Sequence, residues 1–127
     1  MSVGGFNIRV RNAIWLRDNG SCVRCGVSLQ GTRGSYQHRC ARGMGGSRDV
    51  LTGSVVNGVL MCGHATSPDG CHHWAEDHPT QAAFYGYRVP QGGDPSLFPM
   101  YVHGRGWVLL EADVTYLDVD HDEHEAS

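Results

Sequence analysis

The sequence has no lysine and no long apolar run, and both absences narrow the class of protein it can encode. A helix that crosses a membrane needs roughly 18 consecutive apolar residues. No segment approaches that length, so we expect no membrane span. The first five residues lack the basic start and apolar stretch of a secretory signal. We therefore expect a chain that stays in a reducing cytoplasm, where disulfide bonds are rare.

The chain has room for one folded domain with a small core. Its 127 residues are 40 % hydrophobic and 9 % aromatic, which is too apolar for a disordered chain. Eighteen glycines indicate many turns and loops. A loop-rich chain of this size usually needs a metal ion or disulfide bonds in addition to its core. A structural metal is therefore expected.

Basic and acidic side chains are concentrated in opposite parts of the sequence. Up to residue 54, eight arginines stand against two acidic residues, a balance of +6. Beyond residue 54, two arginines stand against eleven acidic residues, a balance of −9. A guanidinium group pairs bidentately with phosphate oxygens, so an arginine-only basic half favours nucleic acid as a partner. An ordinary solvated basic face explains the charge alone equally well.

The cysteines predict a zinc site. Two cysteines separated by two residues, followed by a second pair, can together bind one tetrahedral zinc ion through four thiolates. The four are Cys22, Cys25, Cys62 and Cys71. His64 is an alternative ligand in the loop of the second pair, and we expect it to lie at the surface instead. Cys40 is left over, and we expect it to be a small, half-buried side chain.

Hydrophobic periodicity predicts a mixed fold. An amphipathic helix is expected over 6–17, ended by Asp18-Asn19-Gly20. Strands are expected at 35–38 and within 49–60, separated by a long loop, and a helix is expected over 71–83 that Pro79 kinks or restarts. Three later strands are expected at 101–103, 107–110 and 114–117. The division is a core over 1–85, a β extension packed on it over 86–117, and an acidic disordered tail over 118–127.

The order of motifs between the two cysteine pairs resembles the HNH endonucleases, most closely the small zinc-containing ones of actinobacterial phages. The resemblance covers about residues 8–85 and is carried by His38-Arg39, Arg42-Gly43-Met44-Gly45-Gly46, Asn57 and Cys71-His72. It implies an α+β fold with a zinc-stapled ββα-metal core. It also implies metal-dependent hydrolysis of DNA phosphodiester bonds, which leaves 3′-hydroxyl and 5′-phosphate ends.

The resemblance also implies a role for each matching residue. His38 is the expected general base, because an imidazole with a pKa of about 6.5 is neutral and basic enough to take a proton from water. Asn57 is expected to hold a loop and the base in place. His72 is the expected ligand of a catalytic Mg²⁺ or Mn²⁺ ion.

The chain departs from the family at Gln37. Relatives commonly have His or Asp here as a second ligand, whereas Gln37 offers only a neutral carbonyl oxygen. Glu76, one helical turn after His72, is the expected supplement to the metal site. Position and charge make Arg39, Arg42 and Arg48 the expected phosphate contacts.

The resemblance implies DNA as the partner and the cytoplasm of a bacterial host as the location. Phages of this type often use such an enzyme beside the packaging terminase, which implies a role in genome packaging. One alternative is a non-catalytic zinc-stapled DNA-binding or packaging-accessory protein, which Gln37 favours. Another is an interaction protein that uses the 86–117 extension as its interface; deleting residues 86–127 is then expected to leave the zinc core folded.

Overall fold

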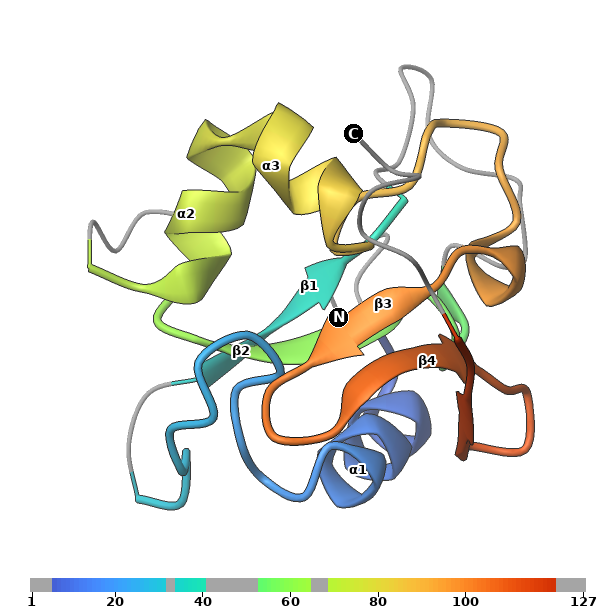
Figure 1. Ribbon diagram of the computed structural model, residues 1–127. Helices are drawn as coiled ribbons and strands as arrows, with labels where there is room; N and C mark the ends of the chain where they lie inside the picture. Colours follow the sequence, from blue (N-terminus) through green and yellow to red (C-terminus); the bar gives the residue numbers. More distant parts are fainter. Residues whose placement is uncertain (1–5, 32–33, 41–52, 65–68, 121–127) are drawn as a thin grey trace.

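The computed structural model describes residues 6–31, 34–40, 53–64 and 69–120. These residues form three α-helices and two small antiparallel sheets (Figure 1). The helices are α1 (Ile8–Arg17), α2 (Cys71–Asp77) and α3 (Pro79–Phe84). The strands are β1 (Gly34–His38), β2 (Gly58–Cys62), β3 (Met100–Val102), β4 (Gly106–Leu110) and β5 (Tyr116–Asp118), and a short 3-10 turn, η2 (Pro95–Leu97), precedes β3. The mixed fold class is thus confirmed.

Helix α1 begins at Ile8, two residues later than expected, and ends at Arg17 as expected. The side chain of Asn7 accepts a hydrogen bond from the Val10 amide at 2.9 Å, which caps the first turn. At the other end Asn19 and Gly20 have φ angles of 60° and 61°, the left-handed conformation that stops a helix. No helix in the described part of the chain is long and apolar enough to cross a lipid bilayer.

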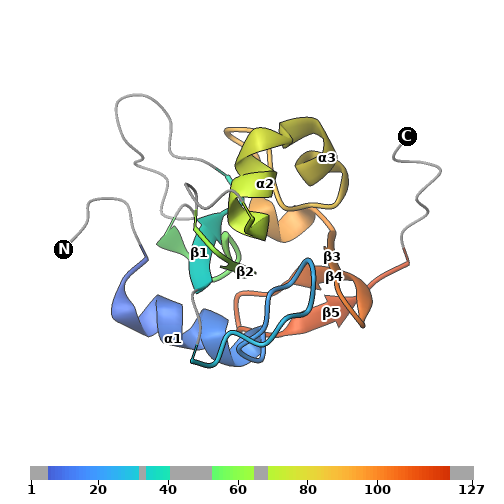
Figure 2. The same cartoon turned by 90° about the vertical axis from the view of Figure 1, so that its left-hand side faces the viewer.

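Strands β1 and β2 form a hairpin that lies between α1 on one side and α2 on the other (Figure 2). Four of the five β2 residues are buried, because helices cover both of its faces. At Gly58 an added Cβ atom would lie 2.4 Å from Cδ1 of Ile14, so only glycine lets α1 pack this closely. Strand β2 starts late in the expected range and extends to Cys62; residues 49–52 lie outside the described residues.

The segment expected as one helix over 71–83 is two helices. Helix α2 ends at Asp77, the next residue His78 has a non-helical φ of −126°, and α3 begins at Pro79. Proline cannot donate a hydrogen bond inside a helix but fits its first turn. The predicted restart at Pro79 is confirmed.

A buried ion pair ties the C-terminal sheet to the core. The side chains of Arg17 and Asp18 are 2 % and 0 % exposed and lie 2.8 Å apart. Arg17 also donates to the carbonyl of Gly58 at 2.6 Å, and Asp18 accepts from the Leu60 amide at 2.9 Å. From β5, the Tyr116 hydroxyl donates to Asp18 at 2.5 Å. Arg17 also donates to the Val55 carbonyl at 2.6 Å, so its guanidinium group is used inside the core.

Replacing Tyr116 with phenylalanine is expected to lower the free energy of unfolding by about 1.5–3 kcal/mol, the usual contribution of a hydrogen bond to a charged group. The variant removes one oxygen and leaves one buried Asp18 oxygen with fewer donors. Urea denaturation at fixed zinc measures the change. The control is Tyr36→Phe, because the Tyr36 hydroxyl has no hydrogen-bond partner among the described residues. An equal effect of both variants would contradict the prediction.

Candidate metal centre and the histidines beside it

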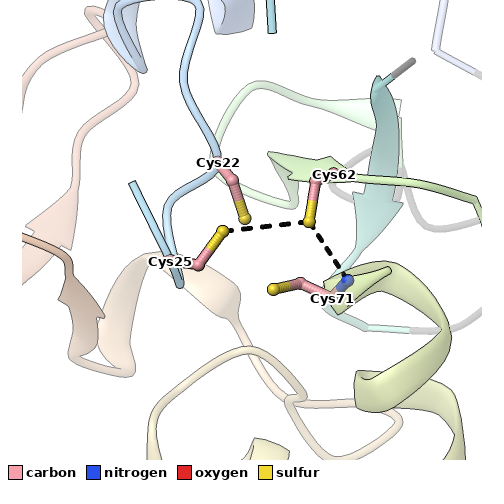
Figure 3. Close-up of side chains that lie close together, drawn as sticks. All are labelled: Cys22, Cys25, Cys62 and Cys71. Carbon is pink, nitrogen blue, oxygen red and sulfur yellow. Dashed lines mark hydrogen bonds between the residues drawn. The ribbon is translucent and has the colours of Figure 1, made fainter. Parts of the chain in front are cut away.

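Four cysteine sulfurs from three separate segments point toward one another (Figure 3). Cys22 and Cys25 lie in the turn after α1, Cys62 ends β2, and Cys71 begins α2. All four Sγ atoms lie within 4.8 Å of one another, and those of Cys25 and Cys62 are 3.8 Å apart. Zinc–sulfur bonds of about 2.3 Å in a tetrahedron place the sulfurs about 3.8 Å apart. The cluster therefore fits a structural zinc ion.

The turn that carries Cys22 and Cys25 is shaped by backbone hydrogen bonds and one glycine. The Gly26 amide donates to the Cys22 carbonyl at 2.8 Å, and the Val23 amide joins the turn to Leu60 of β2 at 3.0 Å. Gly26 has a φ of 82°, and a Cβ atom there would lie 2.3 Å from the His103 ring. Glycine is thus required for both the turn and the packing of the β3–β4 connection on it.

Hydrogen-bond donors surround the cysteine sulfurs. A hydrogen bond with the Cys71 thiol lowers the pKa of Cys22 to about 4, while the same bond raises the pKa of Cys71. The Cys71 amide donates to Cys62 Sγ at 3.3 Å, and Arg24 donates to Cys71 Sγ at 3.4 Å. The Cys71 amide and the Arg24 guanidinium group stabilise negative charge on the sulfurs that they reach, and the thiolate is the form that binds zinc.

Cys40 lies outside this cluster, as expected. It is buried, and its thiol contacts the Pro90 carbonyl at 3.5 Å. The four cysteines are the one group of three or more Cys, His, Asp or Glu side chains in the described residues that is close enough to hold an ion. His64 does not belong to it.

The side chain of Asn57 forms hydrogen bonds with the backbone of Cys40. Its side chain accepts from the Cys40 amide at 2.6 Å and donates to the Cys40 carbonyl at 3.0 Å. Its own carbonyl accepts from the Arg39 amide at 2.8 Å. Because Arg39 and Cys40 follow His38 directly, Asn57 fixes the backbone at the end of β1. The ring of Phe6 also stacks on the His38 ring, with centroids 4.1 Å apart.

His72 lies in the first turn of α2 and contacts β1. Its Nδ1 atom is 2.5 Å from the Ser35 hydroxyl, which donates to the Gly63 carbonyl at 2.6 Å. Burial lowers the pKa of His72, and the nearby rings of His38 and His64 lower it further, while Glu76 opposes them. His72 is thus neutral at neutral pH, the state in which an imidazole binds a metal. No sequence pattern singled out Ser35.

Gln37 and Glu76 differ in how available they are as ligands. Gln37 is 1 % exposed and donates through Nε2 to the Tyr87 carbonyl at 2.8 Å. Its Oε1 atom is buried and has no hydrogen-bond partner among the described residues, so a carbonyl oxygen is left over. Glu76 forms an ion pair with Arg88 at 2.7 Å and is 47 % exposed. The sequence did not predict this pair.

The prediction that Arg39 contacts phosphate was wrong. Its side chain is 1 % exposed and donates to four backbone carbonyls, those of Val56, Gly86, Pro95 and Phe98. Burial lowers the pKa of Arg39 to about 9, so it remains charged at neutral pH. The guanidinium group is fully used inside the protein. Arg42 and Arg48 lie outside the described residues.

Comparison with known proteins gives no match to a family model, to a curated protein or to a solved structure.

Proposed function

We propose that the chain is a metal-dependent endonuclease of the HNH type that hydrolyses phosphodiester bonds in DNA. The proposal is carried by one observation: His72 at the start of α2 contacts Ser35 of β1, the strand that ends at His38. Asn57 bonds to the backbone beside His38. The order His, Asn, His across strand, turn and helix is the order of the resemblance.

In the proposed reaction His38 takes a proton from a water molecule, and the water oxygen attacks the phosphorus atom. The bond from phosphorus to the 3′ oxygen breaks, and the leaving oxygen takes a proton from solvent. A bound Mg²⁺ or Mn²⁺ supplies stabilisation of the negative charge on the phosphate and on that oxygen. His72 and the Oε1 atom of Gln37 are the proposed protein ligands. Stacking on Phe6 and the Asn57 bonds keep the base in one orientation.

The proposed partner is DNA, with Arg42 and Arg48 as phosphate contacts. The proposed setting is the cytoplasm of a bacterial host during phage genome packaging, beside terminase. The separation of charge along the sequence supports a basic DNA-binding half.

Nicking of supercoiled plasmid tests the proposed function. The protein is expected to relax plasmid with Mg²⁺ or Mn²⁺ and to lose activity in EDTA under conditions that leave its zinc content unchanged. His38→Ala is expected to lower the rate about 10²–10⁴-fold, the usual contribution of a general base. The matched control is His78→Ala, because His78 is an exposed histidine on the connection between α2 and α3. Equal cutting by the His38 variant and the native protein would refute the proposal.

A non-catalytic zinc-stapled DNA-binding or packaging-accessory protein is the second candidate. It is favoured by the groups expected to bind a catalytic ion with His72. The Gln37 side chain carries no charge, and the Glu76 carboxylate forms an ion pair with Arg88. Binding of DNA at equal affinity by the native protein and His38→Ala, with cutting by neither, would support this candidate over the nuclease.

A further inference from the structure

A chain of two short hydrogen bonds joins Gly63, Ser35 and His72. The Ser35 hydroxyl donates its hydrogen to the Gly63 carbonyl at 2.6 Å. A hydroxyl group has one hydrogen to donate, and a carbonyl oxygen can only accept. In its 2.5 Å contact with His72 Nδ1, the Ser35 oxygen must therefore act as the acceptor. It follows that Nδ1 of His72 carries a proton.

We propose that Ser35 is a positioning residue that keeps the proton of the His72 ring on Nδ1, so that Nε2 is the nitrogen that binds the divalent ion. A neutral imidazole has one protonated and one unprotonated nitrogen, and the partner of one nitrogen decides which atom is left for a metal. The identity of the ion rests on the proposed nuclease function. The assignment of the proton to Nδ1 does not.

The cysteine cluster holds both ends of this hydrogen-bond chain. Gly63 directly follows Cys62, and His72 directly follows Cys71. The Cys71 amide also donates to Cys62 Sγ at 3.3 Å, which links the two ligands independently of a metal. Zinc binding at the four sulfurs would therefore fix the separation that the Ser35 hydroxyl bridges.

Gly70 allows the start of α2 to approach β2 closely enough for this arrangement. A Cβ atom at residue 70 would lie 2.7 Å from the Cys62 carbonyl oxygen and 2.8 Å from Cα of Gly63. Both neighbours are backbone atoms, which cannot move aside as a flexible side chain can. A side chain at residue 70 would push His72 away from β1, and the Ser35 hydroxyl would then no longer reach both partners.

The test compares the zinc-loaded full chain with Ser35→Ala and Ser35→Thr. The ¹⁵N chemical shifts of the two His72 ring nitrogens show which of them carries the proton, and electron paramagnetic resonance measures Mn²⁺ affinity. The native protein is expected to show a protonated Nδ1. Ser35→Ala is expected to lose this preference and to bind Mn²⁺ about 10–100-fold more weakly, the usual cost of losing a partner behind a metal ligand. Ser35→Thr keeps a hydroxyl and is expected to restore both.

The control variant is Ser21→Ala, whose hydroxyl donates only to a nearby turn carbonyl and is expected to leave both readouts unchanged. A proton on Nε2 in the native protein would overturn the inference. An Ala variant with native ring shifts and native Mn²⁺ affinity would do the same. If the ring shifts follow the prediction and Mn²⁺ does not bind, the positioning of the ring stands. The ligand role of Nε2 and the nuclease proposal are then both refuted.

Discussion

Zinc-free protein is expected to be unfolded at room temperature, and added zinc is expected to refold it with one ion per chain. The four cysteines join the turn after α1, the end of β2 and the start of α2, so a metal bound there crosslinks most of the core. Structural zinc contributes about 10–16 kcal/mol in small zinc domains, whereas a domain of this kind is stable by only about 5–15 kcal/mol. Circular dichroism during chelation and zinc titration measures both steps.

Cysteine variants provide the matched comparison for this prediction. Cys62→Ser removes one of the four sulfurs and the acceptor of the Cys71 amide, so it is expected to bind zinc poorly and to lose cooperative unfolding. Cys40→Ser changes a buried cysteine outside the cluster and is expected to keep one zinc ion and a cooperative transition. A chelated native protein that still melts cooperatively at an unchanged temperature would show that the fold does not depend on metal.

Replacing Arg39 with methionine is expected to destabilise the protein by more than about 4 kcal/mol, which is exceptional for a single substitution. Methionine fills similar space but leaves four buried carbonyl oxygens without their donor. Each such loss costs about 1–3 kcal/mol. Lysine keeps the charge but lacks the planar guanidinium group with its five donors. The stability of Arg39→Lys is therefore expected to lie between that of Arg39→Met and that of the native protein.

Chemical denaturation at constant zinc concentration measures this effect. Arg88→Met is the matched control, because Arg88 also pairs through its guanidinium group but lies partly exposed in an ion pair with Glu76. Partly exposed pairs contribute about 0–1 kcal/mol. If the two methionine variants lose similar free energy of unfolding, the buried hydrogen bonds of Arg39 contribute no more to stability than the exposed ion pair of Arg88.

The same contacts bear on the β extension over residues 86–117. Three of the four carbonyls that accept from Arg39 belong to this extension. The Tyr87 carbonyl, which accepts from Gln37, also belongs to it. So does the Tyr116 hydroxyl, which donates to Asp18. Deleting residues 86–127 would strip these partners from a buried arginine and a buried carboxylate. We therefore expect that the zinc core does not stay folded without the extension, contrary to the expectation from the sequence.

Local patterns in the sequence predicted most of the secondary structure and the metal cluster. The C-terminal end of α1, the restart at Pro79 and the β3–β4 hairpin are set by residues close in sequence, where short-range rules hold. The spacing of the cysteines was sufficient to group all four correctly. These features follow from chemistry that each segment carries by itself.

The buried polar contacts could not be predicted in this way. Arg39 was predicted to contact phosphate from its position and charge alone, yet its side chain is buried. Its acceptors are backbone carbonyls up to 59 positions away, and every residue has such a carbonyl, so no sequence signal marks them. Ser35 is similar, because strand alternation puts it on the Gln37 face but does not reveal that a Gly63 carbonyl lies within reach.

The burial of Arg39 sets an order of events while the chain is being made. All four zinc ligands are present once Cys71 has been added to the chain, whereas Pro95 and Phe98, whose carbonyls enclose the arginine, are added later. A nascent chain can thus gather its metal while its interior is still open to water. Translation that stops in this interval would release a product that holds zinc around an unfinished core, a natural target for proteolysis.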